Sequence, residues 1–286
     1  MKLEIYRSLW TNDFDLDGAI EDCRHGPFDG VEGPVPGDSI EREIFIQKIR
    51  GSGEPFIAEI TTGGGYVPRY REVGRHLDEF RRKLEIASRA APRFVTALVG
   101  CDAWPIATSV DFLGRAMAAA ADHQLRVSFE THRSRVTFNP WTAAEIVHQL
   151  PSIELTCDFS HWCCVCERLV MDEEPALLQL FASHTRHIHG RIGYDQGPQV
   201  PHPAAPMYRL ALEAHERWWN EIWKTQARSG FSTTTLTPEF GPDGYLQSAP
   251  FTETPAGSLD EINHWMATRQ RERFNLQQAV IASANA

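Results

Sequence analysis

The sequence lacks any uninterrupted apolar run near the ~18 residues that a membrane-spanning helix needs. Its first residues, Met1–Tyr6, also lack the apolar core and small-residue cleavage site of a signal peptide. Positive charge is scarce, with 28 Lys and Arg against 38 Asp and Glu and a formal net charge of −10. We therefore expect a cytoplasmic protein that binds neither a membrane nor nucleic acid, because both surfaces attract clustered Lys and Arg.

Several common motifs are also missing. No Gly- or Ser-rich linker divides the chain, and the Pro-rich stretch Gly197–Pro206 is expected to be a long loop. The glycines Gly63–Gly65 are not followed by the Lys-Ser/Thr pair of a phosphate loop. Three of the six cysteines, Cys163, Cys164 and Cys166, have no zinc-type spacing, so buried thiols are expected there.

Short apolar, β-branched runs alternate with longer segments of helical period along the whole chain. The predicted strands are 3–10, 28–32, 56–61, 94–100, 125–130, 153–158, 186–190 and 233–239. The predicted helices are 14–24, 38–50, 73–89, 106–122, 139–150, 163–182 with a break at Pro175, 207–228 and 258–282. This rhythm predicts an α/β fold, a single-domain (β/α)8 TIM barrel over residues 1–286, with an open doubly wound sheet as the rival.

Acidic and imidazole groups stand where the second half of the predicted strands end, which is where barrel chemistry lies. They are Glu130, Asp158, a histidine of strand seven and Glu239. Crowded carboxylates repel one another in a low-dielectric mouth, and a bound cation relieves that repulsion. Three carboxylates and one imidazole suit Mn²⁺, Mg²⁺ or Co²⁺ better than a thiolate-seeking metal. The alternative is a separate salt bridge for each acid.

Strand seven offers two histidines, His187 and His189. We expect them to point to opposite sides of the strand, so that one faces the barrel lumen and the other packs outward under the helices.

These motifs resemble the xylose isomerase-like barrel superfamily of sugar (phosphate) isomerases and epimerases. The resemblance runs from Phe28–Glu32 to the last helix. In the ketose 3-epimerase branch, the metal ligands are Glu, Asp, His and Glu on strands five to eight, and the second His of a His-x-His is the ligand. The resemblance therefore implies His189 rather than His187, and it matches His161 to a His three residues after the Asp. The implied metal ligands are Glu130, Asp158, His189 and Glu239.

Two departures separate this chain from that branch. The branch has a substrate-binding Arg six residues past its ligand His, where this chain has Asp195, and Arg191 lies two residues past His189. Glu130 is followed by a different segment, residues 131–133 (Thr-His-Arg). The metal site is therefore expected to carry over better than the substrate.

The resemblance implies a divalent-metal-dependent sugar or polyol-ketone isomerase or epimerase of carbohydrate metabolism. Glu130 and Glu239 would be the catalytic carboxylates, moving a proton next to the carbonyl through an enediolate. One divalent metal is expected, Mn²⁺ first, with Mg²⁺, Co²⁺ or Zn²⁺ as alternatives. The candidate substrate-binding residues are His161, His132, Arg191, Trp10 and Trp104.

Three other functions remain open. A lyase or dehydratase on keto-sugars or inosose-like ketones would use the same metal site. A phosphodiester endonuclease is disfavoured by the net charge of −10. A non-catalytic sugar- or metal-binding protein is the last alternative. Members of the superfamily often form homo-oligomers, so Trp218, Trp219 and Trp223 at helical spacing are expected either to pack in the core or to form a subunit interface.

Overall fold

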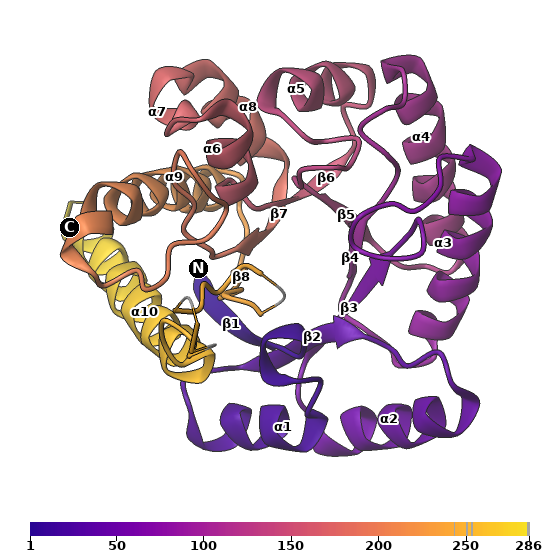
Figure 1. The fold of residues 1–286 in the computed structure, drawn as a ribbon, viewed down its shortest axis with the longest axis horizontal. Coiled ribbons are helices and arrows are strands. Elements are labelled where there is room, and N and C mark those ends of the chain that lie inside the picture. Colours follow the sequence, from indigo (N-terminus) through magenta and orange to yellow (C-terminus); the bar gives the residue numbers. More distant parts are fainter. Residues whose placement is uncertain (243, 250, 253, 285–286) are drawn as a thin grey trace.

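Eight parallel strands close into one barrel. The computed structural model describes residues 1–242, 244–249, 251–252 and 254–284. The strands pair in chain order, and β8 pairs with β1 to complete the ring (Figure 1). The fold predicted from the sequence is confirmed, and the open sheet is excluded. The strands are β1 (Lys2–Ser8), β2 (Gly30–Pro34), β3 (Phe56–Thr61), β4 (Val95–Leu98), β5 (Val127–Glu130), β6 (Glu154–Cys157), β7 (Thr185–His189) and β8 (Thr233–Thr237).

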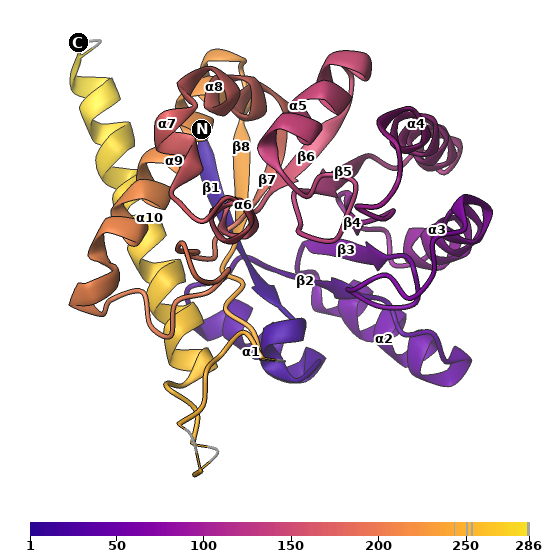
Figure 2. The ribbon, with the colours of Figure 1, turned by 45° about the horizontal axis from the view of Figure 1, so that its top comes forward.

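Helices cover the outside of this barrel. The long α10 lies along its side, in contact with β1 and with the 3-10 turn η1 (Trp10–Asn12) (Figure 2). Among the described residues, no helix combines the length and apolar character that crossing a membrane requires. The helices are α1 (Leu16–His25), α2 (Ser39–Ser52), α3 (Val73–Ser88), α4 (Ile106–Asp122), α5 (Pro140–Gln149), α6 (Ser160–Cys166), α7 (Val170–Glu173), α8 (Pro175–His184), the 3-10 turn η2 (Pro206–Tyr208), α9 (Arg209–Arg228) and α10 (Leu259–Ala284).

Local signals explain where several helices begin. The Asn139 side chain accepts a hydrogen bond from Thr142 N at 2.9 Å, and Pro140 occupies the first turn of α5, as the sequence predicted. The segment predicted as one helix over 163–182 is three helices instead. The break at Pro175 is confirmed, and a second break follows Glu167, whose φ of 52° is left-handed and ends α6.

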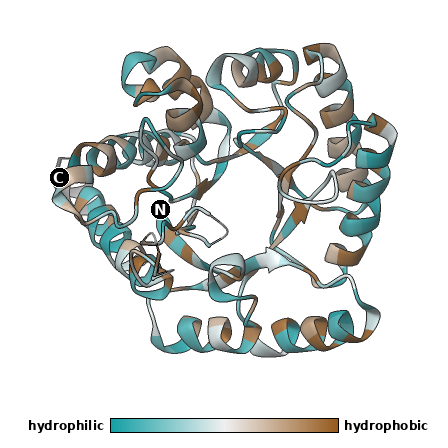
Figure 3. Ribbon diagram, viewed as in Figure 1, coloured by the Kyte–Doolittle hydropathy of each residue, from teal (hydrophilic) through white to brown (hydrophobic). Residues whose placement is uncertain are grey.

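The helices are amphipathic, with hydrophobic and hydrophilic residues alternating along the outer ring (Figure 3). Their apolar sides pack on the outer face of the strands. Trp218, Trp219 and Trp223 on α9 have exposed fractions of 1%, 0% and 0%. They therefore belong to the core of this chain, and the alternative of a subunit interface built on them is excluded.

The interior of the barrel changes character along its axis. Tyr6, Ile57 and Phe94 form an apolar layer near the amino-terminal end. Above it, the Thr96 hydroxyl donates to Thr156 Oγ1 at 2.8 Å, and Ser128 shares a hydrogen bond of 2.7 Å with the same Thr156. Polar side chains thus fill the middle of the barrel, below the carboxyl ends of the strands, where the candidate site lies.

Candidate active site

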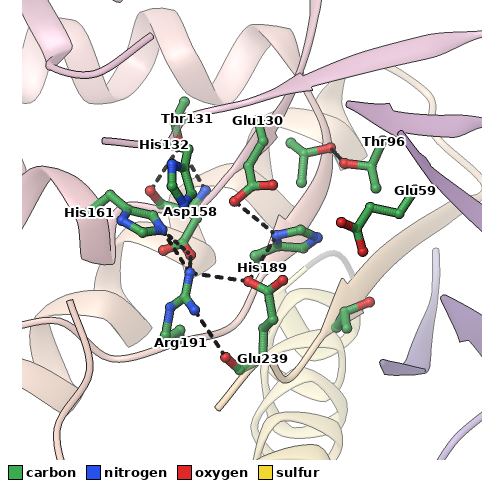
Figure 4. Close-up of polar contacts among 12 residues, drawn as sticks. Glu59, Thr96, Glu130, Thr131, His132, Asp158, His161, His189, Arg191 and Glu239 are labelled. Atoms are coloured by element: carbon green, nitrogen blue, oxygen red, sulfur yellow. Dashed lines mark hydrogen bonds and ion pairs between the residues drawn. The ribbon is translucent and has the colours of Figure 1, made fainter. Parts of the chain in front are cut away.

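Four buried side chains meet at the carboxyl ends of β5 to β8. Glu130 ends β5 and His189 ends β7, while Asp158 and Glu239 lie just beyond β6 and β8. One nitrogen or carboxylate oxygen from each of the four lies within 4.8 Å of the others (Figure 4). The structure therefore brings the four sequence-predicted residues together around one point.

Glu32 on β2 sets the orientation of His189. Glu32 Oε1 lies 3.0 Å from His189 Nε2, and Glu32 Oε2 lies 3.1 Å from His187 Nε2. Burial alone would raise the pKa of Glu32, but the two imidazoles outweigh it and hold that pKa well below its usual range. The ionised carboxylate accepts the Nε2 proton of His189, and Nδ1 faces Glu130 and Glu239. Nδ1 would offer its lone pair to a metal only after giving up its own proton.

His187 lies on the same inner face as His189, so the prediction that they point to opposite sides was wrong. Residues two apart in a strand project to the same side, and Ile188 between them is the residue that faces the helices. The two imidazole centroids are 5.2 Å apart. His187 packs edge-on against Tyr6 and Phe94 inside the barrel, one layer below the site.

Three atoms of the cluster are buried and have no hydrogen-bond partner among the described residues: Glu130 Oε2, Glu239 Oε2 and His189 Nδ1. His189 Nδ1 lies 3.1 Å from Glu239 Oε2 and 3.5 Å from Glu130 Oε1, in neither case with hydrogen-bond geometry. Buried polar atoms without partners are costly. A divalent cation would satisfy all three atoms, so the residues present fit such an ion.

Asp158 differs from the two glutamates because protein groups engage both of its oxygens. Oδ1 accepts from Ser160 N at 2.9 Å, and Oδ2 accepts from Arg191 Nη2. The same Nη2 lies 3.3 Å from Glu239 Oε2, and the Arg191 side chain is buried. The guanidinium thus offsets the charge of two acids. Asp158 could hold a metal only while it also stays paired with Arg191.

Crowding moves the pKa values of the two glutamates apart. Burial, reinforced by Glu239, raises the pKa of Glu130 to about 7 although His189 opposes the shift. For Glu239, the attraction of His189 and Arg191 outweighs burial and lowers the pKa below its usual range. Burial would lower the pKa of His189, but Glu239 and Glu32 outweigh it and raise that pKa well above its usual value.

Glu59 on β3 is a fifth acid at this end of the barrel, after Glu32, Glu130, Asp158 and Glu239, and it was not predicted from the sequence. It lines a cavity of about 90 Å³ together with Glu130, Arg191 and Glu239. Burial, with Glu239 and Glu130 adding to it, raises the pKa of Glu59 to about 8. A charged residue inside an otherwise apolar parallel strand was the available signal, since both faces of such strands are normally apolar.

Aromatic side chains from three loops, those after β1, β3 and β8, cover the cavity. Tyr245, which is 6% exposed, lies 5.5 Å from the Trp10 ring and 6.5 Å from the Tyr66 ring, centroid to centroid. The Arg191 guanidinium carbon is 4.7 Å from the Tyr245 centroid. Trp10 therefore lies at the cavity, as predicted. Tyr66 and Tyr245 come from long loops without a sequence motif and were not predicted.

The remaining predicted substrate-binding residues divide into two groups. The His132 and His161 rings lie near Glu130, 3.9 Å apart between centroids and tilted by 49°. Burial lowers the pKa of both well below the usual value, so they are neutral. Trp104 is not brought to the cavity. Its indole donates to Arg71 O at 2.7 Å and packs on Phe112, because the left-handed Gly100 (φ 72°) turns the chain outward after β4.

Gly193 is expected to be essential to the packing of the loop that carries Asp158. A Cβ at this position would lie 2.4 Å from Ser160 O and 2.6 Å from Ser160 Cα, both main-chain atoms. Gly193→Ala is therefore expected to destabilise the fold by about 1–3 kcal/mol through overpacking. Thermal unfolding should show this as a lower Tm, by about 2–4 °C for each kcal/mol.

Gly74→Ala in α3 is the matched control for this substitution, because no atom lies within 4 Å of the added Cβ. It should leave the Tm unchanged or raise it slightly. Equal Tm values for the two variants would contradict the packing argument.

No protein-family profile and no curated protein sequence matches this chain. Solved structures do. An L-ribulose 3-epimerase has a TM-score of 0.61 at 13% identity, over 98% of each chain. The IOLI protein with a binding zinc atom has a TM-score of 0.61 at 15% identity, over 97% of each chain. The probable 3-DHS dehydratase AsbF from Bacillus anthracis has a TM-score of 0.60 at 11% identity, over 93% of this chain and 97% of that one.

Endonuclease IV from Thermus thermophilus shares the fold as well, at 12% identity and a TM-score of 0.59 over 97% of this chain and 100% of that chain. The same barrel thus serves several reactions, and the reaction must be argued from the site. The chain has the fold that these enzymes share, and the resemblance to the xylose isomerase-like barrels expected from its sequence is confirmed at the level of fold.

Proposed function

We propose that the chain is a divalent-metal-dependent isomerase or epimerase of a sugar or polyol ketone. The observation that carries this proposal is the convergence of Glu130 Oε2, Glu239 Oε2 and His189 Nδ1 beside Asp158. All three atoms are buried and lack a hydrogen-bond partner among the described residues. Mn²⁺ suits this oxygen-rich set best, with Mg²⁺, Co²⁺ and Zn²⁺ as competitors. When bound, such an ion polarises a carbonyl and so acidifies the neighbouring C–H.

The two glutamates are placed to move that proton. Glu130 Oε1 and Glu239 Oε2 lie 3.5 Å and 3.1 Å from His189 Nδ1, with Glu130 above and Glu239 below this nitrogen in Figure 4. Glu239 has a lowered pKa and is ionised at neutral pH, which suits the base that removes the proton. Glu130 is the second carboxylate beside His189 and would return a proton on the other face. Removal on one face and return on the opposite face inverts the carbon centre.

The neutral imidazoles of His132 and His161 and the guanidinium of Arg191 would bind the substrate's hydroxyl groups. His132 and Arg191 line the cavity. His161 Nε2 accepts from Arg191 Nη2 at 2.8 Å, so its proton is on Nδ1, which has no hydrogen-bond partner among the described residues. Arg191 also holds Asp158, so it orders the site while placing positive charge next to developing negative charge on the substrate.

Proton NMR in D₂O tests the proposal. Mn²⁺ is loaded, a panel of ketoses, keto-glycosides and inososes is offered, and products are recorded after the metal is removed. Deuterium next to the carbonyl in an epimer or isomer is the expected result. Loss of water or of an aglycone would replace the isomerase by a lyase, and no exchange on any compound would overturn the proposal.

The endonuclease alternative is not supported by the cavity. The acids sit in a space of about 90 Å³ covered by Trp10, Tyr66 and Tyr245. Nucleic acids are bound by grooves lined with Lys and Arg, and this chain carries a net charge of −10. Uncleaved abasic-site duplex in the presence of Mn²⁺ or Zn²⁺ is the expected outcome.

Glu32→Gln is expected to weaken metal binding about 10- to 100-fold, because Gln cannot supply the charge that holds both His187 and His189 by Nε2. Competition with a chelating dye gives the dissociation constant, and circular dichroism verifies the fold. An unchanged affinity in a folded variant would show that His189 does not bind the metal through Nδ1.

A further inference from the structure

A second cavity adjoins the one that holds the acids. Its volume is about 460 Å³, against about 90 Å³ for the inner cavity. Trp10, Glu59 and Tyr66 line both spaces. A molecule that reaches the acids from this side therefore passes between these three side chains, and any part that does not fit the inner cavity would extend into the outer one.

The outer cavity has the lining of a small-molecule site. It lies between the loops after β1, β2 and β3 and the helix α3. Phe14, Val35 and Ile86 contribute apolar surface, and Phe14 is 57% exposed at its rim. Mostly apolar walls with a few polar groups are typical of ligand pockets.

The backbone holds Phe14 at this rim. Asp13 and Phe14 have φ values of 47° and 59°, in the left-handed region that non-glycine residues avoid. Two hydrogen bonds fix the turn: Phe14 N donates to Leu9 O at 2.8 Å and Asp15 N to Asn12 O at 2.8 Å. The exposed ring is thus presented by a fixed turn.

The charges of the outer cavity do not form an anion clamp. Lys83 Nζ lies 2.9 Å from Glu79 Oε1 and also donates to Thr61 O at 2.6 Å. Arg82 lines the same cavity, as do Glu59 and Glu79. Lys83 is thus paired, and Arg82 is left as a single cation, fewer than the several converging cations of an anion clamp. A neutral ring finds apolar walls and peripheral hydrogen-bonding groups there.

We infer that the outer cavity binds a second ring carried by the substrate, so that the substrate is a keto-sugar glycoside rather than a free monosaccharide. The keto-sugar would occupy the inner cavity, and its ring substituent would pass Trp10 and Tyr66 to pack on Phe14. The inference rests on the proposed function of the acids. A second sugar ring and an aromatic ring both present the apolar face that these side chains bind, and the experiment separates the two.

The test compares three substrates with the Mn²⁺-loaded protein: a free keto-glucose, its phenyl glycoside, and the corresponding keto-disaccharide. We expect kcat/KM for deuterium exchange to be at least about tenfold higher for one or both glycosides, because binding energy from a remote group is available to the reaction. The larger gain of the two identifies an aromatic or a sugar substituent.

Phe14→Ala is the diagnostic variant, because Phe14 lines the outer cavity but not the inner one and is 57% exposed. Circular dichroism verifies that the variant folds. It should reduce the glycoside-to-free-sugar ratio of kcat/KM by about tenfold. Ile44→Ala on α2, 50% exposed and away from both cavities, is the matched control and should leave that ratio unchanged.

A binding measurement separates failure of the subsite from failure of the proposed function. With Mg²⁺ in place of paramagnetic Mn²⁺, saturation-transfer NMR on phenyl glucoside, which lacks the ketone, should show transfer to the phenyl protons that Phe14→Ala removes. Exchange without glycoside preference and without a Phe14 effect would overturn the subsite and leave the proposed function standing. Absence of exchange on every substrate would overturn the proposed function, and the phenyl saturation transfer would then decide the subsite alone.

Discussion

Glu239→Gln is expected to lower the rate of deuterium exchange on the keto-sugar by about a thousandfold or more, because it removes the group that takes the proton. The loss should fall on kcat rather than KM, since the amide keeps the shape of the side chain and the substrate's other contacts remain. Glu130→Gln should be comparably impaired if Glu130 is the partner on the opposite face. Stopped exchange assays at saturating Mn²⁺, with the metal content of each variant measured, give these rates.

Glu154→Gln is the matched control. Glu154 begins β6, at the far end of the barrel, and pairs with Arg126 and Arg186 instead of the acids of the site. The same chemical change there should leave exchange at the wild-type rate. A Glu239→Gln protein that binds Mn²⁺ and exchanges at the wild-type rate would show that another group is the base, and Glu59 would be the next to test.

The architecture could be read from the sequence because each element is encoded locally. Alternating apolar strands and amphipathic helices, with the Asn139-Pro140 start of α5 as one example, are short-range patterns. The ends of neighbouring parallel strands meet at one rim, so the order of Glu130, Asp158, His189 and Glu239 along the chain was enough to place them together.

The rest of the site depends on contacts between distant segments. Glu32 is recognisable as a partner of His189 only once β2 and β7 face each other across the lumen. Tyr245 covers the cavity from a loop after β8 that carries no motif. Trp104 failed as a prediction because a single left-handed glycine, Gly100, redirects the loop after β4. Loop direction is set by such individual dihedral angles, which periodicity does not encode.

Metal affinity is expected to rise steeply between about pH 6 and pH 8.5, because the ion must displace protons to bind. Without metal, the pKa of Glu130 is raised to about 7 and that of Glu59 to about 8, in each case chiefly by burial. His189 is also protonated, since its pKa lies well above the usual value. Each displaced proton steepens the dependence by about tenfold per pH unit. Calorimetric titration in two buffers of different ionisation enthalpy counts the protons released.

Stability without metal should change in the opposite direction. A carboxyl group whose pKa is raised by folding stabilises the fold fully below its unfolded pKa, and that contribution is lost as pH rises through the folded pKa. The same holds for His189. The Tm of the metal-free protein should therefore fall as pH rises through about 7 to 8, and the stabilisation by Mn²⁺ should widen over that window.

Glu59→Gln makes this expectation specific, because Glu59 is not one of the four proposed ligands. A divalent cation nearby would lower the pKa of Glu59 by its charge alone, so Glu59 should contribute to proton release without binding the metal. The variant should release fewer protons on metal binding and show a metal-free Tm that falls less with pH. Equal proton release in wild type and variant would mean that Glu59 is already ionised before the metal binds. The raised pKa of the Glu59 carboxyl would then be wrong, and so would the expectation that the metal-free site lacks enough positive charge to keep this group ionised.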